Sequence, residues 1–184
     1  MTLPEQDPSS GQIEDMDVLF TLAAPADIIG DIEEMHTKFK VRDIVETFDN
    51  DKLLAWLEFR LKFLQEELNE GVKALNELKS AQQTSSGDAA ADSEAAVKAA
   101  DDLVDSMIDL IVVATGTLDG LQVDSDEAWN RVHTANMQKE PGIKPNRPNP
   151  LGLPDLIKPE GWVSPTHADN IGLLERLVPG RGDE

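Results

Sequence analysis

The chain has 184 residues, and its 36 acidic and 16 basic side chains give a formal net charge of −20. Such a charge repels nucleic-acid backbones and anionic lipids, so we expect no nucleic-acid and no membrane partner. The absence of cysteine excludes disulfides and thiolate chemistry. With no apolar run long enough to cross a bilayer and no secretory signal, the sequence favours a cytoplasmic protein.

The N-terminal half of the chain predicts two helices of very different length. Residues 1–25 are interpreted as a partly irregular segment, within which 17–22 are too few to assign. A first helix is predicted over residues 26–39 because apolar residues recur there at helical spacing. A long bundle helix is predicted from Asp51, its N-cap, to about residue 81. Its apolar seam comprises Leu54, Leu57, Leu61, Leu64, Leu68, Val72, Leu75 and Leu78.

A second long helix is predicted after a polar connection. Residues 82–93 are rich in Gln, Ser and Ala and are predicted to be flexible, because they can bury little apolar surface. The helix then runs from residue 93 to about 117, with Gly120 as its stop signal. Residues 107–114 are apolar on every side except at Asp109, so this half is expected in the middle of the packed structure.

The C-terminal part changes character at its prolines. Ser125 is predicted to cap a last helix that extends to about residue 139. Eight of the 11 prolines lie at or after Pro141, so residues 141–184 are predicted to form an extended arm without a core of its own. We therefore expect an all-α fold, with a four-helix-bundle-like domain over residues 26–140 and a Pro-rich C-terminal arm.

Acidic residues of the long helix form the first half of a candidate metal site. Glu67 and Glu70 are three residues apart, and Glu66 and Glu70 are four apart, so they lie on neighbouring turns beside the leucine seam. Considered alone, these residues are more simply interpreted as a solvated helix face.

The second half of the candidate site is a stripe formed by Asp102, Asp105 and Asp109, at positions i, i+3 and i+7. A carboxylate among apolar neighbours, as at Asp109, needs a partner if it is buried. That partner can be a divalent metal held between facing helices, or an ion pair with Arg60 or Lys98. For Asp102 a solvated position is the favoured interpretation.

In their order along the chain, these segments resemble the MazG-like all-α nucleoside triphosphate pyrophosphohydrolases, the group that includes phosphoribosyl-ATP pyrophosphohydrolase. The EE-x-x-E motif of that family corresponds to residues 66–70, and its second acidic motif to residues 105–109. Where many members have the Glu of E-x-x-D, this chain has Ser106, so Asp105 or Asp102 completes the second pair. The segment VHTANMQK (132–139) is similar to V-H-x-S-N-M-x-K, and KPEGWVSP (158–165) is similar to the K-P-x-G-W-x-x-P ending of bacterial and viral members.

The resemblance implies a hydrolase that uses Mg²⁺, with Mn²⁺ as an alternative, and converts a (d)NTP to a (d)NMP and diphosphate. It also implies a homodimer or homotetramer that shares its site between subunits, in the cytoplasm of a bacterium or a phage-infected cell. Arg60, two turns before the first motif, is a further candidate for phosphate binding, with packing as an equal alternative. The candidate residues are Glu66 as the catalytic residue, Glu67, Glu70, Asp105 and Asp109 as metal ligands, and Asn136, Lys139 and Arg60 for substrate binding.

Two questions remain open at this point, one about the function class and one about two tryptophans. An acidic helical protein without enzymatic activity, such as a DNA mimic, would suit the charge, but it would have no reason to bury Asp109. Trp129 and Trp162 could stack on a nucleotide base, although packing in the core is the favoured interpretation for both.

Overall fold

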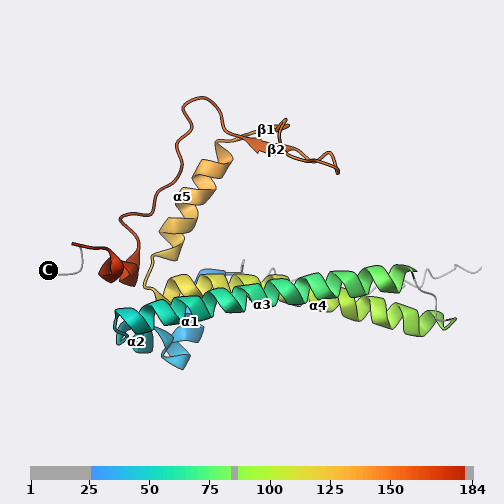
Figure 1. The fold of residues 1–184 in the computed structure, drawn as a ribbon, viewed down its shortest axis with the longest axis horizontal. Coiled ribbons are helices and arrows are strands. Elements are labelled where there is room, and N and C mark those ends of the chain that lie inside the picture. The colour runs from blue at the N-terminus through green and yellow to red at the C-terminus, as the bar shows by residue number, and fades with distance from the viewer. Residues whose placement is uncertain (1–25, 84–86, 181–184) are drawn as a thin grey trace, which may run out of the picture.

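A hairpin of two long antiparallel helices forms the body of the molecule, as the computed structural model in Figure 1 shows. The structure describes residues 26–83 and 87–180, so the predicted segment 1–25, including 17–22, lies outside the described part. The all-α prediction is confirmed, and no helix in the described part is long and apolar enough to cross a membrane. The elements are α1 (Ile28–Phe39), α2 (Val41–Glu46), α3 (Asn50–Gln83), α4 (Ala89–Gly120), α5 (Ser125–Met137), β1 (Glu140–Gly142), β2 (Asp155–Ile157) and the 3₁₀ helix η1 (Gly172–Leu177).

The N-terminus of α3 is capped by a different residue from the one predicted. Asp49 Oδ1 accepts a hydrogen bond from the backbone N–H of Lys52 at 2.8 Å, so the proposal of Asp51 as N-cap is wrong. Asp51 instead lies in the first turn, where the helix dipole favours a negative charge. Asp49 and Asp51 are only two residues apart, and both are residue types that cap helices. Asp49 is the one that accepts a hydrogen bond from a free backbone N–H of the first turn.

The connection between α3 and α4 is shorter than predicted. Asp88 accepts hydrogen bonds from the N–H groups of Ala90 and Ala91, and α4 begins at Ala89. Residues 89–93 are therefore helical, in contrast to the predicted flexible connection over residues 82–93. Alanine has the highest helix propensity, and a cap at Asp88 is enough to extend the helix into this Ala-rich segment.

The other helix ends follow the same capping chemistry. Asp124, not Ser125, caps α5, because its side chain accepts from Glu127 N at 2.9 Å. Gly120 ends α4 as predicted. It also lies against Trp56 of α3, since a Cβ at this position would be 2.8 Å from a ring atom. The short helix α2 was not predicted, because six residues are too few to show a helical period.

The buried and half-buried residues that form the seam between α3 and α4 recur at steps of three and four residues on both helices. The residues of this seam are small in its middle, where Gly71 and Ala74 of α3 are buried, as are Ala99 and Ser106 of α4. Four leucines of the predicted seam lie on a different side of α3 and are exposed, at intervals of seven residues. They are Leu54, Leu61, Leu68 and Leu75.

The hydrophobic core lies at the end of the hairpin where α3 begins and α4 ends. Its buried residues are Val45, Leu53, Leu121, Val123 and Leu173. Leu173 belongs to η1, and its N–H donates to Leu121 O at 2.8 Å. Through Leu173, the C-terminal arm completes the core of the helical domain.

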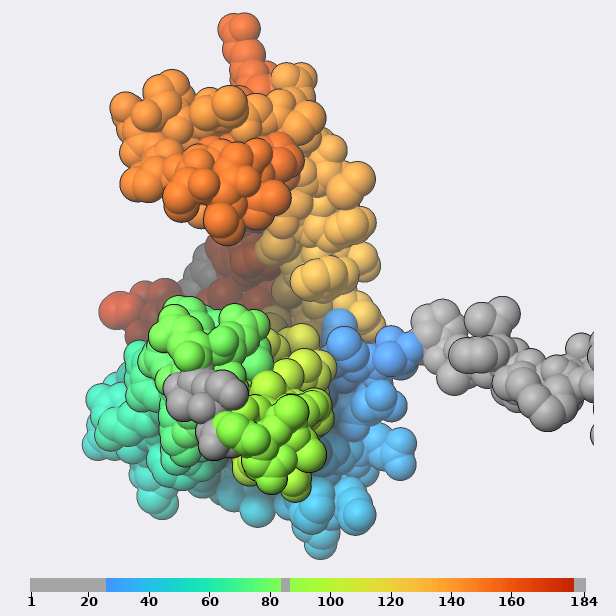
Figure 2. Space-filling view, turned by 90° about the vertical axis from the view of Figure 1, so that its right-hand side faces the viewer, coloured from blue at the N-terminus to red at the C-terminus, as the bar shows by residue number. Residues whose placement is uncertain are grey.

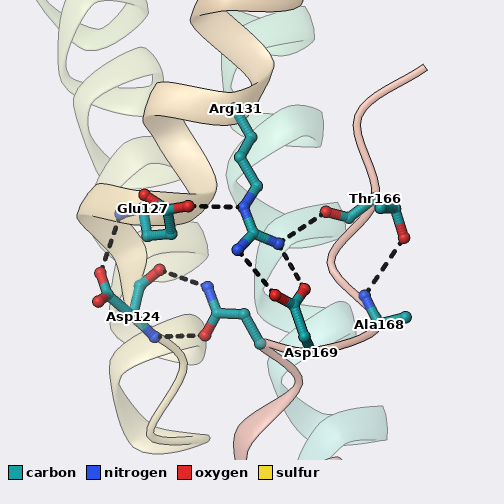
Figure 3. Close-up of polar contacts among 7 residues, drawn as sticks. Asp124, Glu127, Arg131, Thr166, Ala168 and Asp169 are labelled. Carbon is teal, nitrogen blue, oxygen red and sulfur yellow. Dashed lines mark hydrogen bonds and ion pairs between the residues drawn. The ribbon is translucent and has the colours of Figure 1, made fainter. Parts of the chain in front are cut away.

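Before it reaches this core, the arm is fastened along α5 by the polar contacts drawn in Figure 3. Arg131 binds Asp169 through two nitrogens and donates further bonds to Glu127 and to the carbonyl of Thr166. The Asn170 side-chain amide accepts a hydrogen bond from the backbone N–H of Asp124 and donates one to its backbone C=O. These bonds fix the path of the arm relative to α5.

Candidate functional site

The carboxylates predicted from the two acidic motifs lie close to one another in the middle of the hairpin. Glu67 is half-buried in the seam of α3, and this burial raises its pKa. The negative charges that raise this pKa further come from both helices. They are Asp109, Glu70, Glu66 and Asp105. The α3–α4 packing therefore brings the two motifs together around Glu67.

The chemistry of this acidic cluster suits a hard divalent cation. The side chains whose charges raise the pKa of Glu67 are all carboxylates, and Mg²⁺ and Mn²⁺ prefer carboxylate oxygens. Among the residues that the structure describes, no three Asp, Glu or His side chains converge into a formed metal-binding group. The donor set fits the metal, whereas the side-chain positions do not form a closed coordination sphere.

Of the two candidates for the second acidic pair, Asp102 already has a partner. Lys98 Nζ lies 2.6 Å from one Asp102 oxygen and 2.8 Å from the other, on the outside of α4. Asp105, by contrast, contributes to the raised pKa of Glu67. The structure thus favours Asp105 as the companion of Asp109. Within the described residues, neither Arg60 nor Lys98 forms an ion pair with Asp109.

Arg60 links α3 to α4 and does not reach the acidic cluster. Its Nε donates to Thr117 Oγ1 and its Nη2 to the carbonyl of Val113, each at 2.9 Å. The guanidinium carbon lies 6.0 Å from the ring centroid of Trp56, and burial lowers the Arg60 pKa. The structure therefore shows the packing role for Arg60, and substrate contact remains a prediction.

Asn136 and Lys139 lie at the far end of α5, away from the acidic cluster of their own chain. The Lys139 ammonium donates to Asn136 Oδ1 at 2.8 Å. In both Figure 1 and Figure 2, α5 and the following strands project from the side of the hairpin. The acidic cluster and these two residues are thus not brought together within one chain.

A buried pair that the sequence did not indicate joins α1 to α4. His36 and Asp119 are 4% and 3% exposed, and His36 Nδ1 lies 2.6 Å from Asp119 Oδ2. Arg42 Nε approaches the other carboxylate oxygen at 3.4 Å. No local pattern connects two residues 83 positions apart, so sequence reasoning had no signal for this pair.

The two tryptophans discussed above have different environments. Trp129 is 63% exposed and stacks against His133, with 6.2 Å between the ring centroids. The interpretation of Trp129 as a core residue is therefore wrong for the single chain. Trp162 is half-buried, and its Nε1–H donates to Ala135 O at 2.8 Å, so the arm packs on α5 at this ring.

Comparison with known proteins identifies the family of the chain. No curated protein matches the chain. Residues 33–136 match the sequence model of the family described as phosphoribosyl-ATP pyrophosphohydrolase, and this segment runs from α1 into α5. It contains both acidic motifs and ends before Lys139 and the arm. The chain belongs to the phosphoribosyl-ATP pyrophosphohydrolase family, and it is accordingly a nucleotide pyrophosphohydrolase, a hydrolase that acts on acid anhydrides.

Proposed function

We propose that the protein is a Mg²⁺-dependent hydrolase that cleaves a nucleoside or deoxynucleoside triphosphate to the monophosphate and diphosphate. The observation that supports this proposal is the packing of α3 against α4, which places carboxylates of both motifs near the half-buried Glu67. A cluster of like charges is unfavourable by itself and is stabilised by a cation. Family membership supplies the reaction class, cleavage of a nucleotide anhydride.

The metal ligands in this proposal are Glu67 and Glu70 of α3 together with Asp105 and Asp109 of α4. Bound Mg²⁺, or Mn²⁺, would neutralise the phosphate charges and acidify a bound water. Glu66 is the proposed catalytic residue because it adjoins the cluster and is exposed, so its carboxylate can orient water and accept a proton. Asn136, Lys139 and Arg60 are kept as candidate substrate contacts.

We further propose that the protein works as a homodimer or homotetramer. The four leucines at seven-residue intervals on α3 are exposed in the single chain. Ile108 and Ile111 of α4 are also exposed, although their segment is almost wholly apolar. Apolar stripes of this length on neighbouring helices suit packing against further helices. A second copy of the chain is the simplest partner for them.

Product analysis with a panel of NTPs and dNTPs tests the proposed reaction. Each nucleotide is incubated with the protein in Mg²⁺ and, in parallel, in EDTA, and products are separated by anion-exchange chromatography. The proposal requires monophosphate and diphosphate in equal amounts, with Mg²⁺ only. Release of inorganic phosphate and a nucleoside diphosphate, or equal turnover in EDTA, would contradict it.

A further inference from the structure

The arm places a second lysine beside Lys139, on the same aromatic ring. We propose that Lys139, Lys158 and Trp162 form a two-lysine anion site that binds the phosphates of a nucleotide held by the acidic cluster of a second copy of the chain. This inference rests on the proposed function and adds to it two residues from outside the family match, which ends at residue 136. The ligand class is a polyphosphate, either free or as part of a nucleotide.

The ring of Trp162 is held in place and carries both ammonium groups. Its Nε1–H donates to Ala135 O at 2.8 Å, which fixes the indole against α5. Lys158 Nζ lies 4.3 Å from the ring centroid and Lys139 Nζ lies 5.0 Å from it. Both contacts are within the range of cation–π attraction, so one indole attracts both ammonium groups.

Among residues 26–83 and 87–180, these two cations have no acidic partner, although the chain has a large acidic excess. Glu140 and Glu160 are close to Lys139 and Lys158 in the sequence, yet within the described residues neither lysine forms an ion pair. Lys139 instead donates to the neutral amide oxygen of Asn136 at 2.8 Å. A multiply charged anion bound at these ammonium groups would supply the counter-charge that the described residues do not.

The anion site cannot serve the acidic cluster of its own chain as the structure stands. α5 and the strands project from the hairpin (Figures 1 and 2). The residues of the acidic cluster lie midway along α3 and α4 by their sequence positions. The arm is not free to swing back, because Arg131 and Asp169 fasten it to α5 and Leu173 fixes its end in the core. A second hairpin beside the projecting α5 would bring an acidic cluster to the lysines.

Binding of inorganic tripolyphosphate tests the anion site independently of turnover. Titration calorimetry in Mg²⁺ compares the wild type with Lys158→Ala and with the control Lys144→Ala, which removes a lysine of the same arm that does not contact Trp162. Loss of one charge-assisted contact should weaken binding about tenfold in Lys158→Ala and leave the control unchanged. Equal affinity of wild type and Lys158→Ala would overturn the anion site, whether or not the wild type hydrolyses nucleotides.

Mixed oligomers test whether the site acts across subunits. One chain carries Lys139→Ala and Lys158→Ala, the other carries Asp109→Asn, and differently tagged copies are co-expressed and purified as hybrids. Each parent oligomer should turn over nucleotide poorly, whereas the hybrid should recover activity because it contains one site with intact acids and intact lysines. A hybrid as inactive as its parents, or a monomeric wild type, would overturn the proposed action in trans. If the wild type turns over no nucleotide, the proposed function fails, and the tripolyphosphate titration still decides the anion site.

Discussion

Gly71 of α3 lies directly against Ser106 of α4, so close that a Cβ on residue 71 would be 2.7 Å from Ser106 Oγ. Each residue adjoins a proposed metal ligand in sequence, since Glu70 precedes Gly71 and Asp105 precedes Ser106. The missing side chain therefore sets the distance between the helices at the level of the acidic cluster. Ser106 stands where many family members have an acid, and its small buried side chain permits this close approach.

Gly71→Ala should separate the helices and weaken the metal site. Overpacking at such a contact costs about 1–3 kcal/mol of unfolding free energy, and Mn²⁺ affinity measured by calorimetry should fall with it. In the double variant Gly71→Ala/Ser106→Ala the clashing oxygen is gone. The remaining neighbours of the new Cβ would be Met107 Cε at 3.0 Å, the end of a flexible side chain that can shift, and the Cβ of residue 106 at 3.6 Å. The double variant should regain most of the stability and metal affinity; equal loss in both variants would show that the contact does not set the helix distance.

Stability in the absence of metal should depend on pH through Glu67. Its pKa is raised above the ordinary value of 4.5, first by burial and then by the neighbouring carboxylates. The unfolded chain therefore loses this proton first, so the contribution of Glu67 to the free energy of unfolding falls as pH rises from 4.5 to the raised pKa. Above that window the penalty is complete, and below 4.5 it is absent.

Glu67→Gln should remove this pH-dependent loss, which thermal unfolding in EDTA can measure. The variant should melt at a higher temperature than the wild type at neutral pH and gain less from added Mg²⁺. Glu77→Gln, an exposed acid of the same helix that pairs with Lys73, is the matched control. Identical pH profiles for the wild type and Glu67→Gln would mean that burial and the neighbouring carboxylates do not destabilise the ionised form of Glu67.

A charge on the leucine stripe of α3 should break the proposed oligomer. Leu61→Glu places a carboxylate in the middle of the stripe, and desolvating it in an interface is costly. Leu153→Glu on the arm is the control, since Leu61 and Leu153 are both 64% exposed. Light scattering should show smaller particles and a loss of turnover for Leu61→Glu alone. If Leu61→Glu keeps the wild-type mass, the stripe is not an interface.

Asp169→Ala should release the arm without unfolding the helical domain. Arg131 and Asp169 lie at the protein surface, where an ion pair contributes little to global stability. Limited proteolysis should cut the arm faster, and KM for the nucleotide should rise with little change in kcat, because Trp162 and Lys158 lose their fixed position. An unchanged KM in a protein with a released arm would show that the arm takes no part in substrate binding.

The sequence predicts the helices and the acidic motifs because both depend on local spacing. The periods of α3 and α4 and the stop at Gly120 can be recognised within a few turns of chain. The capping residues are displaced by one or two positions, since neighbouring Asp and Ser compete for the same N–H groups. The His36–Asp119 pair depends on packing between distant segments, and no local pattern encodes it.

The same limit applies to the placement of α5 and the arm. Asn136 and Lys139 are predicted as substrate contacts, but their position relative to the acids cannot be predicted, because the direction in which α5 leaves the hairpin depends on the turn at residues 121–124 and on the arm bonded to it. The exposure of Trp129 follows from the same geometry. Periodicity assigned the leucines of α3 to one seam, whereas the structure divides them between the seam with α4 and an exposed stripe.

The central claim is that carboxylates from α3 and α4 hold the metal on which nucleotide cleavage depends, and Asp109→Asn tests it most directly. Mn²⁺ affinity and nucleotide turnover are measured on one preparation, beside the control Asp101→Asn, which changes an exposed acid of the same helix. We predict that Asp109→Asn loses tight metal binding and turnover together while its circular dichroism stays helical, and that the control keeps both. Wild-type metal affinity and turnover in a folded Asp109→Asn protein would contradict the account.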